Sequence, residues 1–261
     1  MLGKRALSRL AILRTQKGYG RAATVAKYMR DERLHGCETR AFAQCGEEIS
    51  DGVIDLGCGA GRTTVPLLPL TSSYLGVDYT SSMIDACRTR FAAATNARFL
   101  VADAADLRTV PDGRAGFVLF SYNGIDNVGH AHRLRILREA KRVLRPGGIF
   151  AFSHHNLNAS EIVRRPRIPT KFTLSTVRQF VGALRNSLVN RWFEERGPDY
   201  EVINDSADGF SLLVYYCSIA AQRRQLASAG FELVACTDML GVEVDPESTR
   251  APFVFHLARK R

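Results

Sequence analysis

The chain has 261 residues, of which 46% are hydrophobic and 24% charged, and its formal net charge at pH 7 is +10. This composition is ordinary for a globular domain. No uninterrupted apolar run approaches the roughly 20 residues that a membrane-spanning helix needs, which argues against a transmembrane protein.

Two segments carry the positive charge. Residues 1–46 hold ten Lys/Arg and three Asp/Glu, and residues 157–197 hold eight and three. The first interpretation is that these are solvated helix faces, and the second is that they meet an anionic partner.

The first 30 residues contain no Asp or Glu, and Leu2, Ala6, Leu10 and Leu13 fall on one helical face. Three interpretations remain open: a plain N-terminal helix, a mitochondrial presequence, and a basic helix at a membrane surface.

The six cysteines are scattered and form no C-x-x-C pair. This pattern argues against a disulfide framework and against a zinc site, so we expect buried thiols and no bound metal. The reducing compartment that such thiols imply predicts a cytoplasmic protein, with the mitochondrial matrix or a membrane-peripheral location as alternatives.

Short apolar strands alternate with helices in the first half of the chain. Strands are predicted at 53–56, 74–78, 98–103, 116–121 and 148–153, with helices best seen at 81–93 and 131–144. This alternation indicates a parallel sheet wound on both faces, with ligands at the carboxyl ends of the strands.

The pattern changes after Asn156. Residues 173–196 are predicted to form a long helix, 200–204 and 212–216 a hairpin, and 218–229 a helix that Gly230 ends. Residues 231–238 and 252–258 are predicted to be the last, antiparallel strands.

A glycine-rich turn follows the first strand, with Gly57, Gly59 and Gly61 at alternate positions. Glycine allows the backbone to approach a ligand closely. The dinucleotide fingerprint G-x-G-x-x-G would need its third glycine at 62, where Arg62 stands. A ligand without a pyrophosphate is therefore favoured.

Three carboxylates occupy the first three strands, with Asp55 beside the glycines and Asp78 and Asp103 at strand ends. Asp78 is placed to accept hydrogen bonds from ribose hydroxyls, and Asp103 from an adenine amino group. Each acid alone could be a helix N-cap, but three at one sheet edge indicate a site.

Residues 50–157 resemble the core of the class I S-adenosylmethionine-dependent methyltransferases, in particular the bacterial small-molecule type. The resemblance rests on residues 53–64, on 75–78 with Ser82 and Met83, on 102–104, and on 137–148, a helix closed by a Pro-Gly-Gly turn that leads into the fifth strand.

The resemblance implies S-adenosylmethionine as cofactor and a doubly wound, mostly parallel sheet of seven strands in the order 3-2-1-4-5-7-6, with an inserted helical cap. It implies one methyltransferase domain over 1–261, which divides into basic N-terminal helices (1–46), a cofactor core (50–156), a basic helical insertion (157–197) and a closing part (198–261).

The resemblance also implies which residues hold the cofactor. The glycines would lie against its methionine part, Asp55 near the amino group, Asp78 on the ribose, and Asp103 with Ala104 on the adenine. The full predicted set is Asp55, Gly57, Cys58, Gly59, Gly61, Asp78, Tyr79, Met83, Asp103, Ala104 and Ser121.

Candidate residues for general acid–base catalysis follow the fourth and fifth strands. They are Asp126, His154 and His155, and at most one of the histidines should face the cleft because adjacent strand residues point to opposite faces. Tyr122, Asn123, Arg164, Arg165 and Arg167 are predicted to contact the acceptor, whereas Tyr215 and Tyr216 are expected to pack in the core.

The expected reaction is methylation of a small molecule, with O-methylation of a sugar, glycolipid or other anionic metabolite as the leading hypothesis. Alternatives are an RNA or quinone-type methyltransferase and a protein that binds S-adenosylmethionine without turnover. Nucleic acid is not favoured, because no aromatic stacking patch is evident. Residues 1–30 are a candidate for contact with a membrane surface, and the oligomeric state is open.

Overall fold

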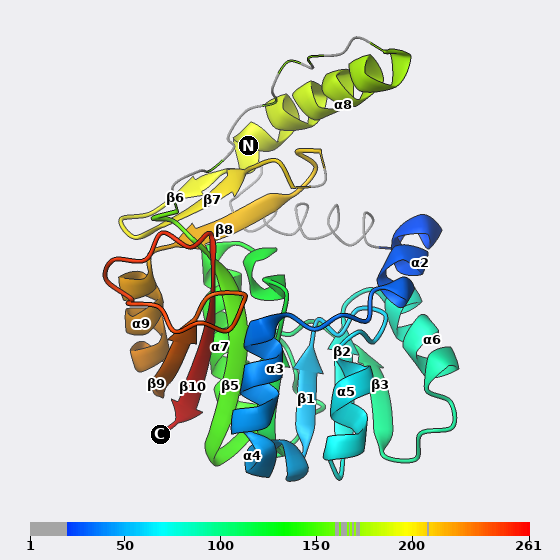
Figure 1. The fold of residues 1–261 in the computed structure, drawn as a ribbon, viewed down its shortest axis with the longest axis vertical. Helices are drawn as coiled ribbons and strands as arrows, with labels where there is room; N and C mark the ends of the chain where they lie inside the picture. The colour runs from blue at the N-terminus through cyan, green and yellow to red at the C-terminus, as the bar shows by residue number, and fades with distance from the viewer. Residues whose placement is uncertain are drawn as a thin grey trace.

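Five parallel strands form the centre of a twisted sheet in the computed structural model, which describes residues 20–159, 162, 166, 168, 170, 173–207 and 209–261 (Figure 1). Their order is β3-β2-β1-β4-β5. They are β1 (Val53–Leu56), β2 (Tyr74–Asp78), β3 (Ala97–Val101), β4 (Ala115–Phe120) and β5 (Leu144–Asn156).

Two further strands close the edge beside β5. Strand β10 (Phe253–Lys260) pairs antiparallel with β5, and β9 (Phe231–Thr237) pairs antiparallel with β10. These seven strands follow the predicted order 3-2-1-4-5-7-6 and confirm it, with β10 as the seventh strand and β9 as the sixth.

Three short strands extend this sheet beyond the seven that were predicted. They are β6 (Glu195–Arg196), β7 (Tyr200–Asn204) and β8 (Leu213–Cys217), and β7 and β8 form the predicted hairpin. The hairpin joins the sheet because β8 pairs in parallel with the last two residues of β5, His155 with Tyr216 and Asn156 with Cys217.

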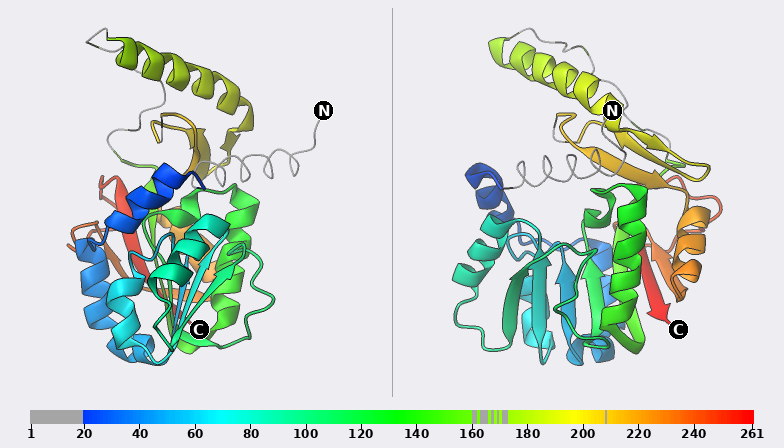
Figure 2. Two further views of the ribbon diagram at one scale, coloured as in Figure 1. Left: turned by 90° about the vertical axis from the view of Figure 1, so that its right-hand side faces the viewer. Right: turned by 180° about the vertical axis from the view of Figure 1, so that it is seen from behind.

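Helices cover both faces of the sheet (Figures 1 and 2). One face carries α3 (Gly36–Gln44), α4 (Gly46–Ser50) and α5 (Thr64–Leu67), and the other carries α7 (His130–Val143) and α9 (Ile219–Ser228). Helix α6 (Ser81–Arg90) packs against β2, β3 and α2 (Ala22–Arg30). Short 3-10 turns lie at η1 (Leu68–Leu70), η2 (Gly124–Asp126) and η3 (Arg191–Phe193).

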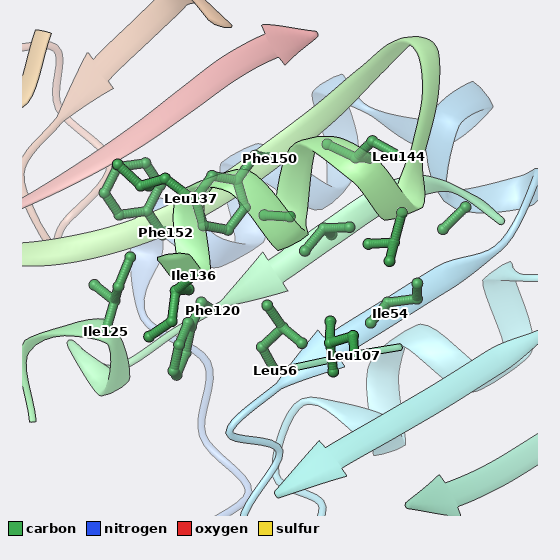
Figure 3. Packing of buried hydrophobic residues seen from close by; sticks show 14 of the residues in the cluster. Ile54, Leu56, Leu107, Phe120, Ile125, Ile136, Leu137, Leu144, Phe150 and Phe152 are labelled. Atoms are coloured by element: carbon green, nitrogen blue, oxygen red, sulfur yellow. The ribbon is translucent and has the colours of Figure 1, made fainter. Parts of the chain in front are cut away.

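The core divides into two layers because strand side chains alternate between faces. Ile54, Phe120 and Phe150 pack with Ile136 and Leu137 of α7 (Figure 3). Their odd-numbered neighbours pack with α3, α4 and α5 on the opposite face. This alternation decides which side chains near the ends of β4 and β5 point to which face.

Two glycine positions shape the pairing of β4 with β5 and the space beside it. The Pro146-Gly147-Gly148 turn was expected to precede the fifth strand, but it lies inside β5 and shifts the β4–β5 register between Ala115 and Phe117. At Gly116, a Cβ atom would come within 2.3 Å of the Glu48 carbonyl oxygen, so this position in β4 has no room for a side chain.

The segment between β5 and α9 stands beyond the carboxyl ends of the strands. Helix α8 (Leu174–Asn190) lies farthest out, past the β6–β8 strands (Figures 1 and 2). It ends at Asn190 and continues into η3, so the predicted helix over 173–196 is confirmed with an earlier end.

No helix among the described residues is long and apolar enough to cross a membrane. All six cysteines are free and buried, as predicted. Within the described part of the chain, no cluster of His, Cys, Asp or Glu could hold a metal ion.

Candidate active site

The glycine-rich turn after β1 has a backbone that other residues would not adopt easily. Gly57, Gly59 and Gly61 have φ angles of 64°, 54° and 89°, in the left-handed region. A Cβ atom on Gly57 would lie 2.7 Å from the Phe120 ring, and one on Gly61 would lie 2.5 Å from Phe91. The turn therefore needs glycine for both conformation and space.

A cavity of about 460 Å³ opens at the carboxyl ends of the central strands, beside a smaller pocket of about 80 Å³. Gly57, Gly59, Ser121, Tyr122 and Tyr28 line both, so the two spaces adjoin. This volume is in the range of small-molecule and cofactor sites.

Asp78 lies at the end of β2 and lines the larger cavity. The backbone N–H groups of Gly59 and Thr80 donate to its two carboxylate oxygens, at 3.1 Å and 2.8 Å. Burial raises the pKa of the Asp78 carboxyl, although these hydrogen bonds oppose the rise. The carboxylate is held in place at the cavity wall, where it can accept from ligand hydroxyls.

Asp55 lines the smaller pocket. Thr63 Oγ1 and the Tyr74 hydroxyl donate to its Oδ2 atom, at 2.5 Å and 2.6 Å. Burial raises the pKa of Asp55 to about 6, against the effect of both hydrogen bonds. A cationic group in the pocket would stabilise the ionised form.

Five of the other predicted cofactor residues also line these spaces, and two do not. Tyr79, Met83, Ala104 and Ser121 line the cavity, and Cys58 lines the smaller pocket. Gly61 and Asp103 line neither space. The Asp103 carboxylate accepts from the Ala105 N–H at 2.9 Å and bonds to His132 Nε2 at 2.8 Å. Burial alone would raise the pKa of Asp103, but these bonds outweigh it and the pKa is lowered.

A buried Glu–Arg pair that the sequence did not indicate borders the smaller pocket. Glu38 of α3 is fully buried and accepts from Arg62 at 2.6 Å and 2.7 Å, and also from the Ser121 hydroxyl. Burial favours a higher pKa for Glu38, but these bonds outweigh it and the pKa is lowered. The pair ties α3 to the glycine-rich turn and to the end of β4.

The loop after β4 has an unusual backbone. Tyr122 and Asn123 both have positive φ angles, 53° and 55°, which cost energy in residues other than glycine. The Ser153 hydroxyl accepts from the Asn123 N–H at 2.8 Å. Tyr122 stacks on His35 with 5.3 Å between ring centroids, and its ring also faces Arg62. Both predicted loop residues line the cavity.

Of the two candidate histidines, His155 lines the cavity and His154 does not. The alternation along β5 turns His154 into the core, where its ring lies 4.8 Å from that of His256 and no described residue bonds to either nitrogen. Burial, followed by the nearby charge of His256, keeps the pKa of His154 well below its usual range.

Asp126 is fully buried and holds His155. The backbone N–H and Nδ1 of His155 both bond to Asp126 Oδ2, each at 2.7 Å. Arg133 of α7, also fully buried, donates to the other carboxylate oxygen. In a neutral imidazole one ring nitrogen donates and the other accepts, so donation from Nδ1 to Asp126 would leave the Nε2 lone pair free to accept a proton. No described residue bonds to Nε2.

The remaining cavity wall is mainly apolar. It is formed by Leu212, Val214, Met239, Phe253 and Ala207, together with Asn127 and His35. Most of these residues come from the closing half of the chain, whereas His35 comes from its start and Asn127 from the end of η2, and no motif marked them. Arg164, Arg165 and Arg167, predicted to contact the acceptor, lie outside the described residues.

The two adjoining spaces fit the cofactor that the resemblance implies. The glycine cradle leaves no room for Cβ atoms beside Phe120, Asp78 offers a carboxylate for ribose hydroxyls, and Asp55 offers one for an ammonium group. The His155 end of the larger cavity remains for a second molecule.

Residues 53–148 match a protein family described as methyltransferase domain. No curated protein matches the chain.

Solved structures with the same fold are numerous and distant in sequence. A Burkholderia thailandensis 1,6-didemethyltoxoflavin-N1-methyltransferase, bound to its substrate and S-adenosylhomocysteine, aligns over 100% of this chain and 91% of its own, with TM-score 0.63 and 14% identity. The glycopeptide N-methyltransferase MtfA, in complex with S-adenosylmethionine, aligns over 87% and 95%, with TM-score 0.56 and 22% identity. The CcbJ methyltransferase of Streptomyces caelestis aligns over 86% and 89%, with TM-score 0.56 and 20% identity.

Proposed function

We propose that this chain is a class I S-adenosylmethionine-dependent methyltransferase and that it methylates a hydroxyl group of a small molecule. The single observation that carries the proposal is His155, which lines the cavity while Asp126 fixes its Nδ1 atom at 2.7 Å. A hydroxyl needs a base in the transition state, whereas a free amine does not.

When bound, S-adenosylmethionine supplies a methyl group on a positively charged sulfur. The glycine-rich turn, Asp55 and Asp78 would hold it. Alignment of the acceptor with the methyl group, and exclusion of water by the cavity wall, are then the main tasks of the protein.

His155 would act as the general base. Its Nε2 atom would take the proton of the acceptor hydroxyl, and the Asp126 carboxylate would stabilise the imidazolium that forms. Arg133 donates to the Asp126 carboxyl group and fixes its orientation, so Asp126 and Arg133 are positioning residues.

The walls beside His155 favour an acceptor with an apolar face next to its hydroxyl, since Leu212, Val214 and Phe253 line this end. A glycolipid or an aromatic metabolite fits this description better than a free sugar. An anionic group on the acceptor remains part of the proposal, and it depends on Arg164, Arg165 and Arg167. Their joint replacement by Gln should raise the acceptor KM and leave cofactor binding unchanged.

The test compares variants in transfer of labelled methyl from S-adenosylmethionine to fractions of a host extract. His155→Ala should lower kcat by roughly 10²- to 10⁴-fold, with cofactor affinity unchanged. His154→Leu is the matched control, because its side chain faces the core on the other side of β5. The label should enter a small-molecule or lipid fraction.

A second candidate is N-methylation, because two of the structural relatives are named as N-methyltransferases. Full activity of His155→Ala, with label in a product that carries it on nitrogen, would replace the hydroxyl proposal by this one. No label in any fraction, despite tight cofactor binding, would argue for a protein that binds the cofactor without turnover.

A further inference from the structure

Helix α8 carries a stripe of apolar side chains on its outer side. Leu174, Val181 and Leu188 follow one another at intervals of two helical turns, and they are 70%, 57% and 59% exposed. Trp192, at the end of the stripe in η3, is 85% exposed. The other exposed apolar residues of the helix are Val177, Leu184 and Val189.

The opposite side of α8 bonds to the protein through polar side chains. Asn186 donates to the Gly209 carbonyl at 3.1 Å, and Asn190 donates to the carbonyls of Phe210 and Ser211 at 3.0 Å and 3.2 Å. A surface helix normally turns its apolar side to the core and its polar side to water. In α8 the stripe of Leu174, Val181 and Leu188 is apolar and exposed, so it calls for an apolar environment.

The charge around the stripe has one sign. Residues 174–193 contain Arg178, Arg185 and Arg191 and no Asp or Glu. Arg178 and Arg185 each lie four residues after a member of the stripe, Leu174 and Val181, and so border it along its length. The surface therefore combines an apolar centre with a cationic margin.

We propose that α8 and Trp192 form an anchor that lies in the surface of a bilayer containing anionic phospholipid. Such a helix buries its apolar side at the boundary of headgroups and acyl chains while its arginines meet lipid phosphates. Tryptophan is enriched at this depth. The helix stands at one end of the molecule, beyond β6–β8, where a flat surface reaches its outer side (Figure 2).

Charge disfavours a second copy of the chain as the occupant. Two α8 helices packed through their stripes would bring the bordering arginines of both copies together, with no carboxylate on either helix to neutralise them. An anionic bilayer neutralises the same arginines and covers the same apolar atoms.

Trp192 is the single tryptophan of the chain, so its emission reports on this surface without a label. The full-length protein is titrated with phosphatidylcholine vesicles, with and without phosphatidylglycerol. Vesicles that contain phosphatidylglycerol should shift the emission to shorter wavelength, and added salt should weaken the effect.

Variants test each part of the surface. Arg178→Gln and Arg185→Gln should each weaken the apparent affinity about fivefold. Val181→Ser with Leu188→Ser should remove binding. The matched control is Leu240→Ser with Val242→Ser, which replaces residues of similar exposure, 80% and 59%, in the β9–β10 connection. Unchanged cofactor binding verifies that each variant is folded.

Four results would overturn the proposal. The first is the absence of a spectral shift with anionic vesicles, and the second is an equal shift with phosphatidylcholine alone. The third is co-flotation of the protein with vesicles without a shift, because this would place the membrane contact elsewhere. The fourth is a dimer in the absence of lipid that Val181→Ser with Leu188→Ser dissociates, since that would make this surface an interface between copies. None of these readouts depends on the proposed methyl acceptor.

Discussion

Arg133→Met should destabilise the protein more than any substitution at the surface. The arginine is fully buried, and its removal takes a donor from Asp126, from the Gln222 side chain at 2.5 Å and from the Ile125 carbonyl at 3.1 Å. It also takes away the cation 4.5 Å from the centre of the Tyr215 ring. Methionine retains most of the apolar volume, so the loss measures charge and hydrogen bonding.

The expected cost comes from the carboxylate left behind. Breaking a buried ion pair from one side costs about 3–5 kcal/mol, because the remaining charge is uncompensated. At roughly 2–4 °C per kcal/mol for a chain of this size, Tm should fall by on the order of 10 °C. The bonds from His155 to Asp126 Oδ2 remain, and they keep the loss near the lower end of the range.

A double-mutant cycle in urea isolates the pair. Arg133→Met with Asp126→Asn should cost less than the sum of the two single variants by about 1–3 kcal/mol, because neither charge is then left alone. Simple additivity of the two losses, or a loss below about 1 kcal/mol for Arg133→Met, would refute this account of the pair.

Two further predictions concern pH. Cofactor affinity should decrease as the pH falls through about 6, the pKa to which burial raises Asp55, because the protonated carboxyl no longer attracts the cofactor's amino group. Calorimetry of the wild type checks this, with Asp55→Asn as the control whose affinity should be low at every pH. A wild-type affinity that does not change with pH would contradict the prediction. Burial, followed by the charge of Arg133, lowers the pKa of His256 to about 3, so below about pH 6.5 the unfolded chain binds a proton that the folded protein does not. The free energy of unfolding should therefore fall with decreasing pH by up to about 1.4 kcal/mol per pH unit from this group, and denaturation of His256→Phe should show a correspondingly shallower slope.

Local patterns were sufficient to predict the strands of the sheet and several residues that line the cavity. Glycines at positions 57, 59 and 61 have the strained conformations that glycine at alternate positions indicated, and Asp55 and Asp78 lie where their strand positions placed them. These residues are close in sequence to the strands that carry them. The order of the seven strands followed from the resemblance.

Long-range contacts account for what the sequence did not indicate. Glu38 reaches the site only because α3 packs beside the glycine-rich turn, 24 residues before its partner Arg62. Phe253 and Met239 reach it through the antiparallel edge. The attachment of β8 to β5 rests on two residue pairs, too few to leave a pattern in either strand. Alternation along β5 predicted that only one histidine would face the cleft, but which one depends on the register that the Pro-Gly-Gly segment shifts.

The narrow attachment of β8 to β5 makes the outer part of the molecule an exchangeable module. Residues 157–217 form one uninterrupted stretch of sequence that follows β5 and ends with β8, while Asp126, His155 and the glycine-rich turn all lie outside it. A corresponding stretch from a relative could be grafted at these two points to change the acceptor without rebuilding the cofactor site. The graft must keep the aromatic ring of Tyr215, because the buried Arg133 side chain packs against the face of this ring.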